Sequence, residues 1–259
     1  MDTNALTTLG LLVAWGADEA LEEAPLDRLA PEPAIPPALP PVPAALPRPP
    51  FGGLAAPSAE RAQAAAAAAG NLAELRAAIA AFEGIGLRDT ATGPVLFEGP
   101  ADAGLLVIGP PPSADDDRAG RPLTGAPGVF FDAMLASIGL SRERLLLTPL
   151  IPWRPPGDRP PSPAELATCL PFLHRLIVIC SPRTALLLGP LAARALLGAG
   201  RRLPKGRLTN AQIPGRDTPL ACLPLATPAQ VRADPDLRPA IWAELRMLRR
   251  HVLEGITQT

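Results

Sequence analysis

The stretch LLLTPLIPWRPPGDRPPSPAEL, residues 145–166, joins a short apolar run to a helix start through a proline-rich loop. The apolar run has the length and composition of a buried β-strand. Ser162, Pro163 and Glu165 then supply an N-cap, a first-turn proline and a capping-box acid, which together predict a helix that continues to Leu176. A buried strand that leads into a capped helix is the repeating unit of parallel α/β sheets.

The same alternation of apolar runs and helices recurs along residues 99–254. Further strands are predicted for LLVIG, TALLLG and PLACLPLA, which begin at Leu105, Thr184 and Pro219. Helices are predicted for VFFDAMLASIGL, closed by Gly139, for PLAARALLG, closed by Gly198, and for residues 235–253. We therefore predict an α/β fold, a three-layer α/β/α domain on a central, mostly parallel four-stranded sheet, with its functional residues where the strands end.

A helical and proline-rich extension precedes this domain. We expect a short N-terminal helix in residues 1–24, a proline-rich linker in 25–57, an alanine-rich helical segment in 58–98 and the α/β domain in 99–254. Repeated proline biases the linker to extended, polyproline-like conformations, although a ligand for a proline-recognising domain is the alternative. A break in the alanine-rich helix is expected near Gly70 and Asn71.

Composition limits the classes of function. The formal net charge of -1 excludes a global basic field, but it leaves a local basic face open. The three cysteines lie far apart without a CxxC pair, which argues against a disulfide framework and a zinc site and favours reduced thiols in the cytoplasm. The apolar start has no basic leading segment, so we expect neither a signal peptide nor membrane association. The motifs GxGxxG, GxxxxGK[ST], HExxH and GxSxG are missing, so readings as dinucleotide-binding protein, NTPase, zinc peptidase or α/β-hydrolase have no support.

Four stretches carry a more specific signal: IGPPPSADDDRAGRPLTGAPG from Ile108, LLLTPLIPWRPPGDRPPSPAEL from Leu145, LLLGPLAARALLG from Leu186 and ATPAQVRADPDLRPAIW from Ala226. In this order and at this spacing they resemble the family-4 uracil-DNA glycosylases. The resemblance implies a three-layer α/β/α fold, DNA as the partner and base-excision repair as the process. It also implies a pocket that accepts a base flipped out of the double helix.

The resemblance assigns the first half of that pocket to the loop after the first strand. The family motif GEAPG begins at Gly109 and extends to Ser113, and Pro110 stands at its carboxylate position. Proline there removes a charged group, and the additional prolines remove backbone N–H donors. Asp117 and the Gly-Arg-Pro turn match the family, whereas Leu123 stands where a phenylalanine stacks on uracil and offers no aromatic face.

The second half of the pocket also lacks polar groups that the family uses. Pro149 replaces the asparagine that reads the uracil edge, and it can form neither amide hydrogen bond. Thr227 takes the place of the histidine in the last motif, where its hydroxyl can donate one hydrogen bond but cannot become cationic. We predict that ordinary uracil excision is lost and that no catalytic residue of the family is intact.

Arginines near the expected site are candidates for DNA contacts. Arg121, Arg154, Arg159 and Arg232, together with Arg238, fall in loops or element ends on this face and are expected to contact phosphates. Solvated surface charge is the alternative. Val231 is a candidate for an apolar wedge into the DNA helix.

Family members hold an iron–sulfur cluster with four cysteines, so the resemblance directs attention to the residues at these four ligand positions. Cys169 matches the last ligand, but Trp153 and Ile85 stand where other ligands are expected. One thiol cannot hold a cluster, so we predict no cofactor and no metal and interpret Cys169 as a small buried residue.

Three functions stay open from the sequence. The first is a divergent glycosylase acting on uracil or another damaged base. The second is an inactive DNA-binding module on the same scaffold. The third is an interaction platform that binds a protein partner through the N-terminal extension. We expect a monomer.

Overall fold

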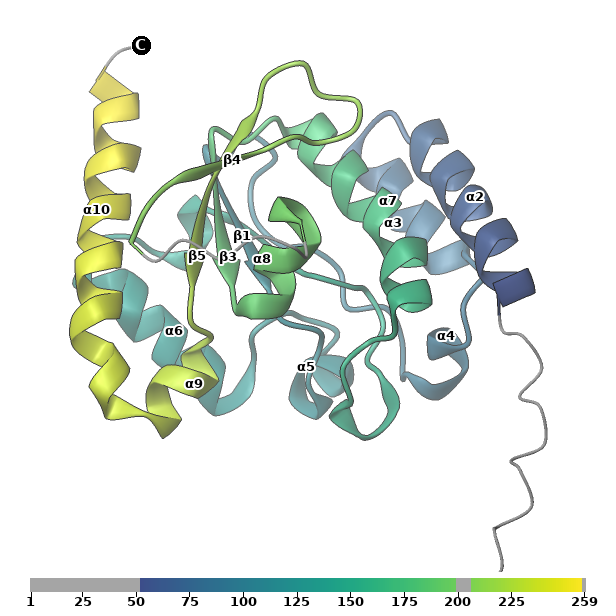
Figure 1. The fold of residues 1–259 in the computed structure, drawn as a ribbon, viewed down its shortest axis with the longest axis horizontal. Coiled ribbons are helices and arrows are strands. Elements are labelled where there is room, and N and C mark those ends of the chain that lie inside the picture. Colours follow the sequence, from purple (N-terminus) through teal and green to yellow (C-terminus); the bar gives the residue numbers. More distant parts are fainter. Residues whose placement is uncertain (1–51, 199–205, 258–259) are drawn as a thin grey trace, which may run out of the picture. The chain divides into compact units, whose positions relative to one another are not determined.

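The computed structural model describes residues 52–198 and 206–257 (Figure 1). The predicted N-terminal helix and most of the proline-rich linker lie outside the described residues. The alanine-rich segment forms α2 (Gly52–Ala68) and α3 (Leu72–Ala81). The predicted break is confirmed, because Asn71 caps α3 and its side chain accepts a hydrogen bond from the N–H of Glu74 at 3.0 Å.

The central sheet contains the four predicted parallel strands. These are β1 (Leu105–Gly109), β2 (Leu146–Pro149), β3 (Thr184–Leu188) and β5 (Leu220–Leu225). A fifth strand that the sequence did not predict, β4 (Thr209–Ala211), pairs antiparallel with β5 at the sheet edge. The strand order is β2-β1-β3-β5-β4, so the first strand in the chain lies inside the sheet and the chain winds outward in both directions.

Helices cover both faces of the sheet (Figure 1). Besides α2 and α3, the longer ones are α6 (Gly125–Ser137), α7 (Pro163–Cys180), α8 (Pro190–Leu197) and α10 (Arg238–Thr257). Shorter pieces are α4 (Leu87–Thr90), α5 (Ala114–Ala119), α9 (Pro228–Ala233) and three single 3-10 turns at Arg142–Arg144, Pro156–Asp158 and Pro235–Leu237.

The core divides into two clusters because alternate residues of each strand point to opposite faces. Leu106 and Ile108 of β1 pack with residues of α2, α3, α7 and α8. Leu105 and Val107 pack with residues of α6, α9 and α10. This two-sided burial confirms the predicted three-layer α/β/α architecture, and it explains why the parallel strands are apolar along their whole length.

Helix α7 is the core helix that leads out of the stretch at residues 145–166. The predicted cap is present, since the Ser162 hydroxyl accepts from the N–H of Glu165 at 3.2 Å and the Glu165 carboxylate accepts from the N–H of Ser162 at 2.7 Å. Among the described residues, α7 alone has the length and composition of a membrane span. Its residues Phe172 and Leu176 are buried in the core cluster, and α2 and α3 pack against it, as a core helix of the domain requires.

Candidate functional site

The carboxyl ends of β2, β1, β3 and β5 lie in this order along one edge of the sheet. Gly109 at the end of β1 pairs with Pro149 at the end of β2. On the other side of β1, Gly189 follows β3 and its N–H donates to the carbonyl of Leu225 on β5 at 2.7 Å. Thr227 follows β5 by two residues. The structure therefore places Gly109, Pro149 and Thr227, which the resemblance assigned to one pocket, on one edge of the sheet.

Two glycines at this edge lie against Leu123 and Thr227, and of the two only Gly189 lacks the space for a Cβ atom. A Cβ added at Gly109 would lie 3.7 Å from Leu123 Cγ and 3.5 Å from the carbonyl oxygen of Thr148. A Cβ added at Gly189, whose φ is +91°, would lie 2.7 Å from the methyl group of Thr227. Gly189 carries no specific signal in the sequence, because a glycine between a strand and a helix is common in α/β folds.

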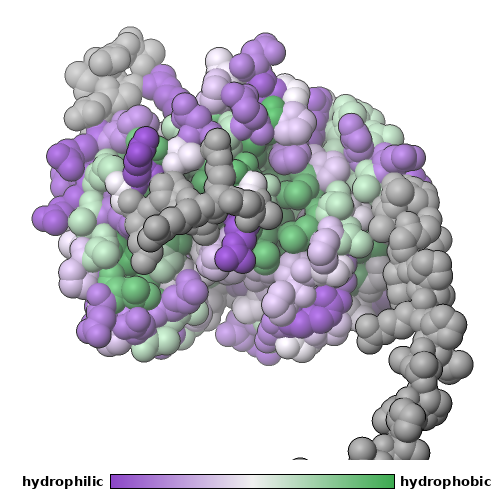
Figure 2. Space-filling view, viewed as in Figure 1, coloured by the Kyte–Doolittle hydropathy of each residue, from purple (hydrophilic) through white to green (hydrophobic). Residues whose placement is uncertain are grey.

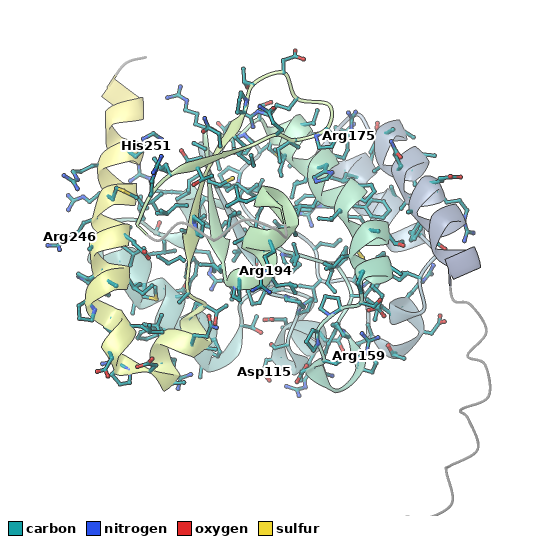
Figure 3. All side chains as sticks on the ribbon, viewed as in Figure 1. Asp115, Arg159, Arg175, Arg194, Arg246 and His251 are labelled. Carbon is teal, nitrogen blue, oxygen red and sulfur yellow. The ribbon has the colours of Figure 1, made fainter. Side chains whose placement is uncertain are left out.

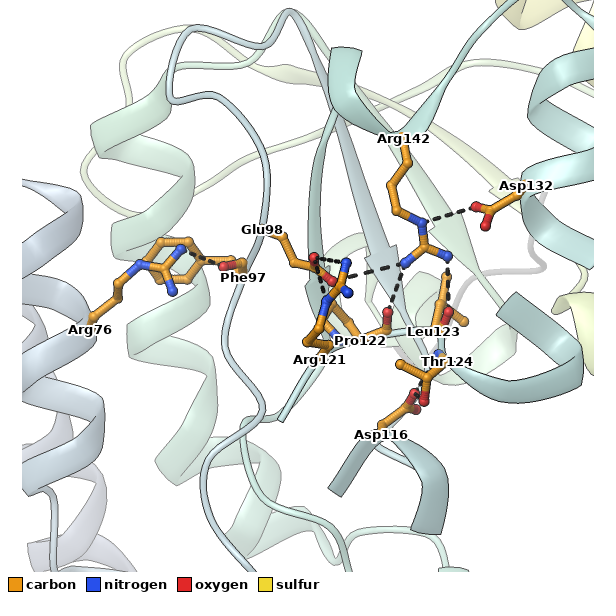
Figure 4. Close-up of polar contacts among 10 residues, drawn as sticks. All are labelled: Arg76, Phe97, Glu98, Asp116, Arg121, Pro122, Leu123, Thr124, Asp132 and Arg142. Atoms are coloured by element: carbon orange, nitrogen blue, oxygen red, sulfur yellow. Dashed lines mark hydrogen bonds and ion pairs between the residues drawn. The ribbon is translucent and has the colours of Figure 1, made fainter. Parts of the chain in front are cut away.

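Leu123 is held in an unusual backbone conformation. Its φ is +51°, a left-handed value that costs energy in a residue with a branched side chain, and its side chain is buried. Arg142 fixes the turn, because its Nη1 donates to the carbonyl of Pro122 at 3.1 Å and its Nη2 to the carbonyl of Leu123 at 2.9 Å (Figure 4). The Nε of Arg142 donates to Asp132 at 2.9 Å. The residue at the stacking position is thus held by a charged side chain that sequence analysis missed.

Asp116 holds the other side of the same loop (Figure 4). It forms a capping box with Ser113 at the start of α5, and its second oxygen accepts from the N–H and the hydroxyl of Thr124 at 2.6 and 2.7 Å. Only 5 % of Asp116 is exposed, so these hydrogen bonds compensate a buried carboxylate. The spacing of Ser113 and Asp116 was a usable signal for this cap.

Asp117 and Ser113 have structural partners. The Asp117 carboxylate accepts from the N–H of Thr92 at 3.0 Å and from its hydroxyl at 2.9 Å, which ties α5 to the segment after α4. The hydroxyl of Ser113 accepts from the N–H of Asp116 at 3.2 Å. Both side chains therefore serve to shape the loop after β1, beside the half-buried Pro110.

Thr227, which stands at the family's histidine position, caps α9 with its hydroxyl group. Its oxygen accepts from the N–H of Gln230 at 3.2 Å and lies 3.2 Å from the Gln230 amide oxygen, to which its proton can be donated. The Thr227 N–H donates to the same amide oxygen at 2.9 Å. In this arrangement the hydroxyl serves the helix rather than the space at the sheet edge.

Three of the five arginines predicted to contact DNA form ion pairs. Arg121 pairs with Glu98 at 2.8 Å, Arg154 with Asp158 at 2.7 Å, and Arg159 with Glu165 at 2.6 Å. In each case the hydrogen bond to the carboxylate raises the pKa of the arginine above its ordinary value. Figure 3 shows Arg159 and Asp115 of α5 at the same end of the molecule. Paired with acids, these three arginines add little net positive charge at the site.

Arg232 differs from these three. It is exposed in the last turn of α9, and no ion pair to it occurs within residues 52–198 and 206–257. Val231, the candidate wedge, is 2 % exposed and belongs to the core cluster under α9. The sequence placed both residues near the site, but only the structure separates the exposed arginine from the buried valine.

The residues at the candidate cluster-ligand positions lie in one apolar region. Cys169 and Trp153 are both buried, and Ile85 packs against the same core cluster. The ring of Phe82 lies 6.3 Å from that of Trp153 and 5.3 Å from that of Phe172, centroid to centroid. Burial raises the pKa of the Cys169 thiol above its ordinary range, so the thiolate form that binds metals is disfavoured. The donor set of one thiol among hydrocarbon groups does not fit an iron–sulfur cluster.

Fold and site together define a three-layer α/β/α protein whose candidate site lies at the carboxyl end of a parallel sheet. Residues 96–246, which contain this edge, match the model of the uracil DNA glycosylase superfamily. The chain belongs to this superfamily as a member of the family-4 type.

Curated relatives agree with this assignment. The chain is 35 % identical over 156 residues to a type-4 uracil-DNA glycosylase of Pyrobaculum aerophilum, a match that covers 58 % of this chain and 79 % of the relative. Matches to the type-4 enzymes of Archaeoglobus fulgidus and Thermotoga maritima are 37 and 34 % identical and cover 42 and 39 % of this chain. The chain spans about half the length of these two relatives, 54 and 53 %.

Proposed function

We propose that this protein binds DNA in base-excision repair and does not release uracil by the route that the resemblance implies. The observation that carries the proposal is the chemistry of the sheet edge. Pro110 and Pro149 have no side-chain polar atom there, and the Thr227 hydroxyl is engaged in the cap of α9. A pocket that selects uracil needs groups that satisfy the polar edge of the base.

Pro110, Pro149 and Thr227 also affect the cleavage of the bond between base and sugar. Cleavage of the bond between base and sugar builds negative charge on the departing base, and a donor placed at that charge lowers the barrier. Loss of one such donor costs about 10²- to 10³-fold in rate in well-studied enzymes. With the carboxylate, amide and imidazole positions all changed, uracil release falls by several powers of ten relative to the type-4 relatives.

The scaffold that would present DNA is retained. The loop after β1 is held by Asp116 and Arg142, both through hydrogen bonds of 3.1 Å or less to the turn around Leu123. Such a rigid loop is what a binding surface needs, because little conformational entropy is then lost on association. DNA is the proposed partner, since the relatives are named as uracil-DNA glycosylases.

We further propose that the protein holds no iron–sulfur cluster. The donor set at the corresponding positions, Cys169 with Trp153 and Ile85, supports this. Iron analysis of protein purified without oxygen is expected to give no stoichiometric iron. About four iron atoms per chain would contradict it, because that is the content of the cluster type in the family.

Binding and base selection are tested with two oligonucleotides that differ in one base, uracil or thymine. Fluorescence anisotropy of the full chain at several salt concentrations is expected to give salt-dependent binding, with equal affinity for the two. The thymine oligonucleotide is the matched control, since it differs from the uracil one only by a methyl group. An affinity at least tenfold higher for uracil, or no binding at low salt, would contradict the proposal.

A further inference from the structure

The exposed side of α10 carries four arginines and one tryptophan. Its members, which we call the α10 arginine face, are Arg238, Trp242, Arg246, Arg249 and Arg250. All five are exposed, and no ion pair to these arginines occurs within the described part of the chain. Glu244, the one acid of α10 whose side chain the structure describes, is 8 % exposed and accepts a hydrogen bond from the N–H of Gly206 at 2.7 Å. This side of α10 is therefore positively charged.

Helical spacing gathers most of the face into one stripe. Arg246 follows Trp242 by four residues, and Arg249 and Arg250 follow Arg246 by three and four. On the opposite side, Ile241, Leu245 and Leu248 are buried in the core. A surface hollow over Ala243 is lined by Arg246, Arg249 and Arg250. Figure 3 shows Arg246 extending away from the domain, and Figure 2 shows hydrophilic residues along the edge that α10 occupies.

Such a stripe is unfavourable by itself. Like charges three and four residues apart destabilise a helix, and Arg246 stands in this relation to both Arg249 and Arg250. A polyanion bound along the stripe would remove this repulsion. Trp242 adds an aromatic surface, 40 % exposed, at the end of the stripe nearer the functional site.

The stripe is connected to the functional site through the chain. Thr227 at the sheet edge caps α9, the exposed Arg232 lies in the last turn of α9, and the turn Pro235–Leu237 leads directly into Arg238. From Arg238 to Arg250 the helix rises about 18 Å, which corresponds to about five phosphates of one strand of a duplex. The arginines thus form a track that leads away from the sheet edge.

We infer that the α10 arginine face binds the phosphate backbone of DNA that extends from the site at the sheet edge, with Trp242 stacking on an unpaired base. The inference rests on the proposed function and deepens it. It follows from a contrast among the described residues: Arg121, Arg154 and Arg159 pair with acids, whereas the arginines of α10 form no ion pair with any acid that the structure describes. Since the net charge of the whole chain is -1, attraction to DNA must come from a local basic surface.

The test compares the full chain with the variants R246Q/R249Q/R250Q and R246K/R249K/R250K. Glutamine removes three charges and keeps helix propensity, while lysine keeps the charges and serves as the matched control. Fluorescence anisotropy is measured with single-stranded DNA between about 50 and 200 mM salt. The plot of the logarithm of the binding constant against the logarithm of the salt concentration is expected to be less steep for the glutamine variant than for the wild type, by about 2 in slope. At about 0.1 M salt its affinity falls at least tenfold, and the lysine variant stays within about twofold of the wild type.

The role of Trp242 is tested separately. Trp242→Ala is expected to weaken binding of single-stranded DNA about tenfold and binding of duplex DNA much less, because only unpaired bases offer a free face for stacking. Circular dichroism checks that each variant folds. If the triple variant does not fold, the single variants R249Q and R250Q decide the question, each with an expected loss of about 0.7 in slope.

The outcomes separate this inference from the proposed function. Unchanged affinity and slope in the glutamine variants, with a wild type that binds DNA, overturn the inference and leave the proposed function standing. A wild type that does not bind DNA at low salt overturns both. Tighter binding of poly-glutamate than of DNA to the same face also overturns the inference, since it assigns the face to an acidic protein.

Discussion

At the scale of single residues, the loop after β1 is shaped by close polar and backbone contacts in addition to the burial of Leu123. The turn at Leu123 has a left-handed backbone, and Gly128 lies directly against the Leu123 carbonyl oxygen. A glycine inside a helix normally costs about 1 kcal/mol relative to alanine. Here the glycine permits the contact that places Leu123 over Gly109.

The variant Gly128→Ala is therefore expected to destabilise the protein, against the usual trend in helices. The added Cβ would overlap the backbone carbonyl of Leu123, which cannot move without breaking its hydrogen bond to Arg142. We expect a loss of about 1–3 kcal/mol in the free energy of unfolding, measured by urea denaturation. Gly104→Ala is the control, since nothing lies within 4 Å of its added Cβ, and an equal loss in both variants would contradict the account.

Asp116 is the second residue on which the loop depends. Asp116→Ala removes the capping box of α5 and leaves the N–H of Thr124 without its acceptor. Loss of a cap and of a buried hydrogen bond to a charge predicts about 2–4 kcal/mol of destabilisation in the same assay. Its neighbour Asp115 pairs with Arg118 at the surface, so Asp115→Ala should cost less than about 1 kcal/mol. Equal effects of the two variants would show that Asp116 does not hold the loop.

At the scale of elements, three helices that start at the functional edge begin with a capping box. The pairs are Ser113 with Asp116 for α5, Ser162 with Glu165 for α7, and Thr227 with Gln230 for α9. The polar side chains of this edge thus satisfy the N–H groups of helix starts. This arrangement stabilises the scaffold and leaves few polar side chains for a ligand.

The cap of α7 predicts a specific dependence on pH. The hydrogen bond from Arg159 lowers the pKa of Glu165 below its ordinary value of 4.5. A carboxyl group whose pKa is lower in the folded than in the unfolded state stabilises the protein at pH values above its unfolded-state pKa. This contribution disappears as the pH falls through the folded-state pKa. Glu165→Gln should therefore lower the thermal midpoint at pH 7 and match the wild type in acid well below pH 4.5. A difference that stays constant over this range would contradict this role of the carboxylate.

The helices and strands differ in how well their positions can be predicted from the sequence. The four parallel strands and α7 were predictable because each is apolar along its length or carries a complete capping box. Strand β4 was not, because TNA at Thr209–Ala211 is three residues of an edge strand without an apolar pattern. Helix α5 was missed because ADDDRA contains no apolar period. The pairing of Arg121 with Glu98 joins residues 23 positions apart, which no local pattern contains.

At the scale of the whole molecule, charge is divided between two surfaces. The loops at the sheet edge hold arginines that pair with acids, and the outer side of α10 holds arginines that pair with none of the acids in the described ranges. The sequence predicted a set of arginines near the site, but their ion pairs depend on the tertiary fold. The family membership, the apolar edge and the basic helix together support the proposal that this glycosylase scaffold binds DNA.

The most direct test of this account is uracil release by the wild-type chain. The protein in excess is incubated with single- and double-stranded DNA that contains one uracil, and abasic sites are counted after alkaline cleavage, with the Pyrobaculum aerophilum relative as the positive control. The account predicts no abasic product above a buffer control under conditions in which the DNA is bound. Uracil release at a rate within about tenfold of the relative would contradict it, because the residues at the sheet edge would then be sufficient for catalysis.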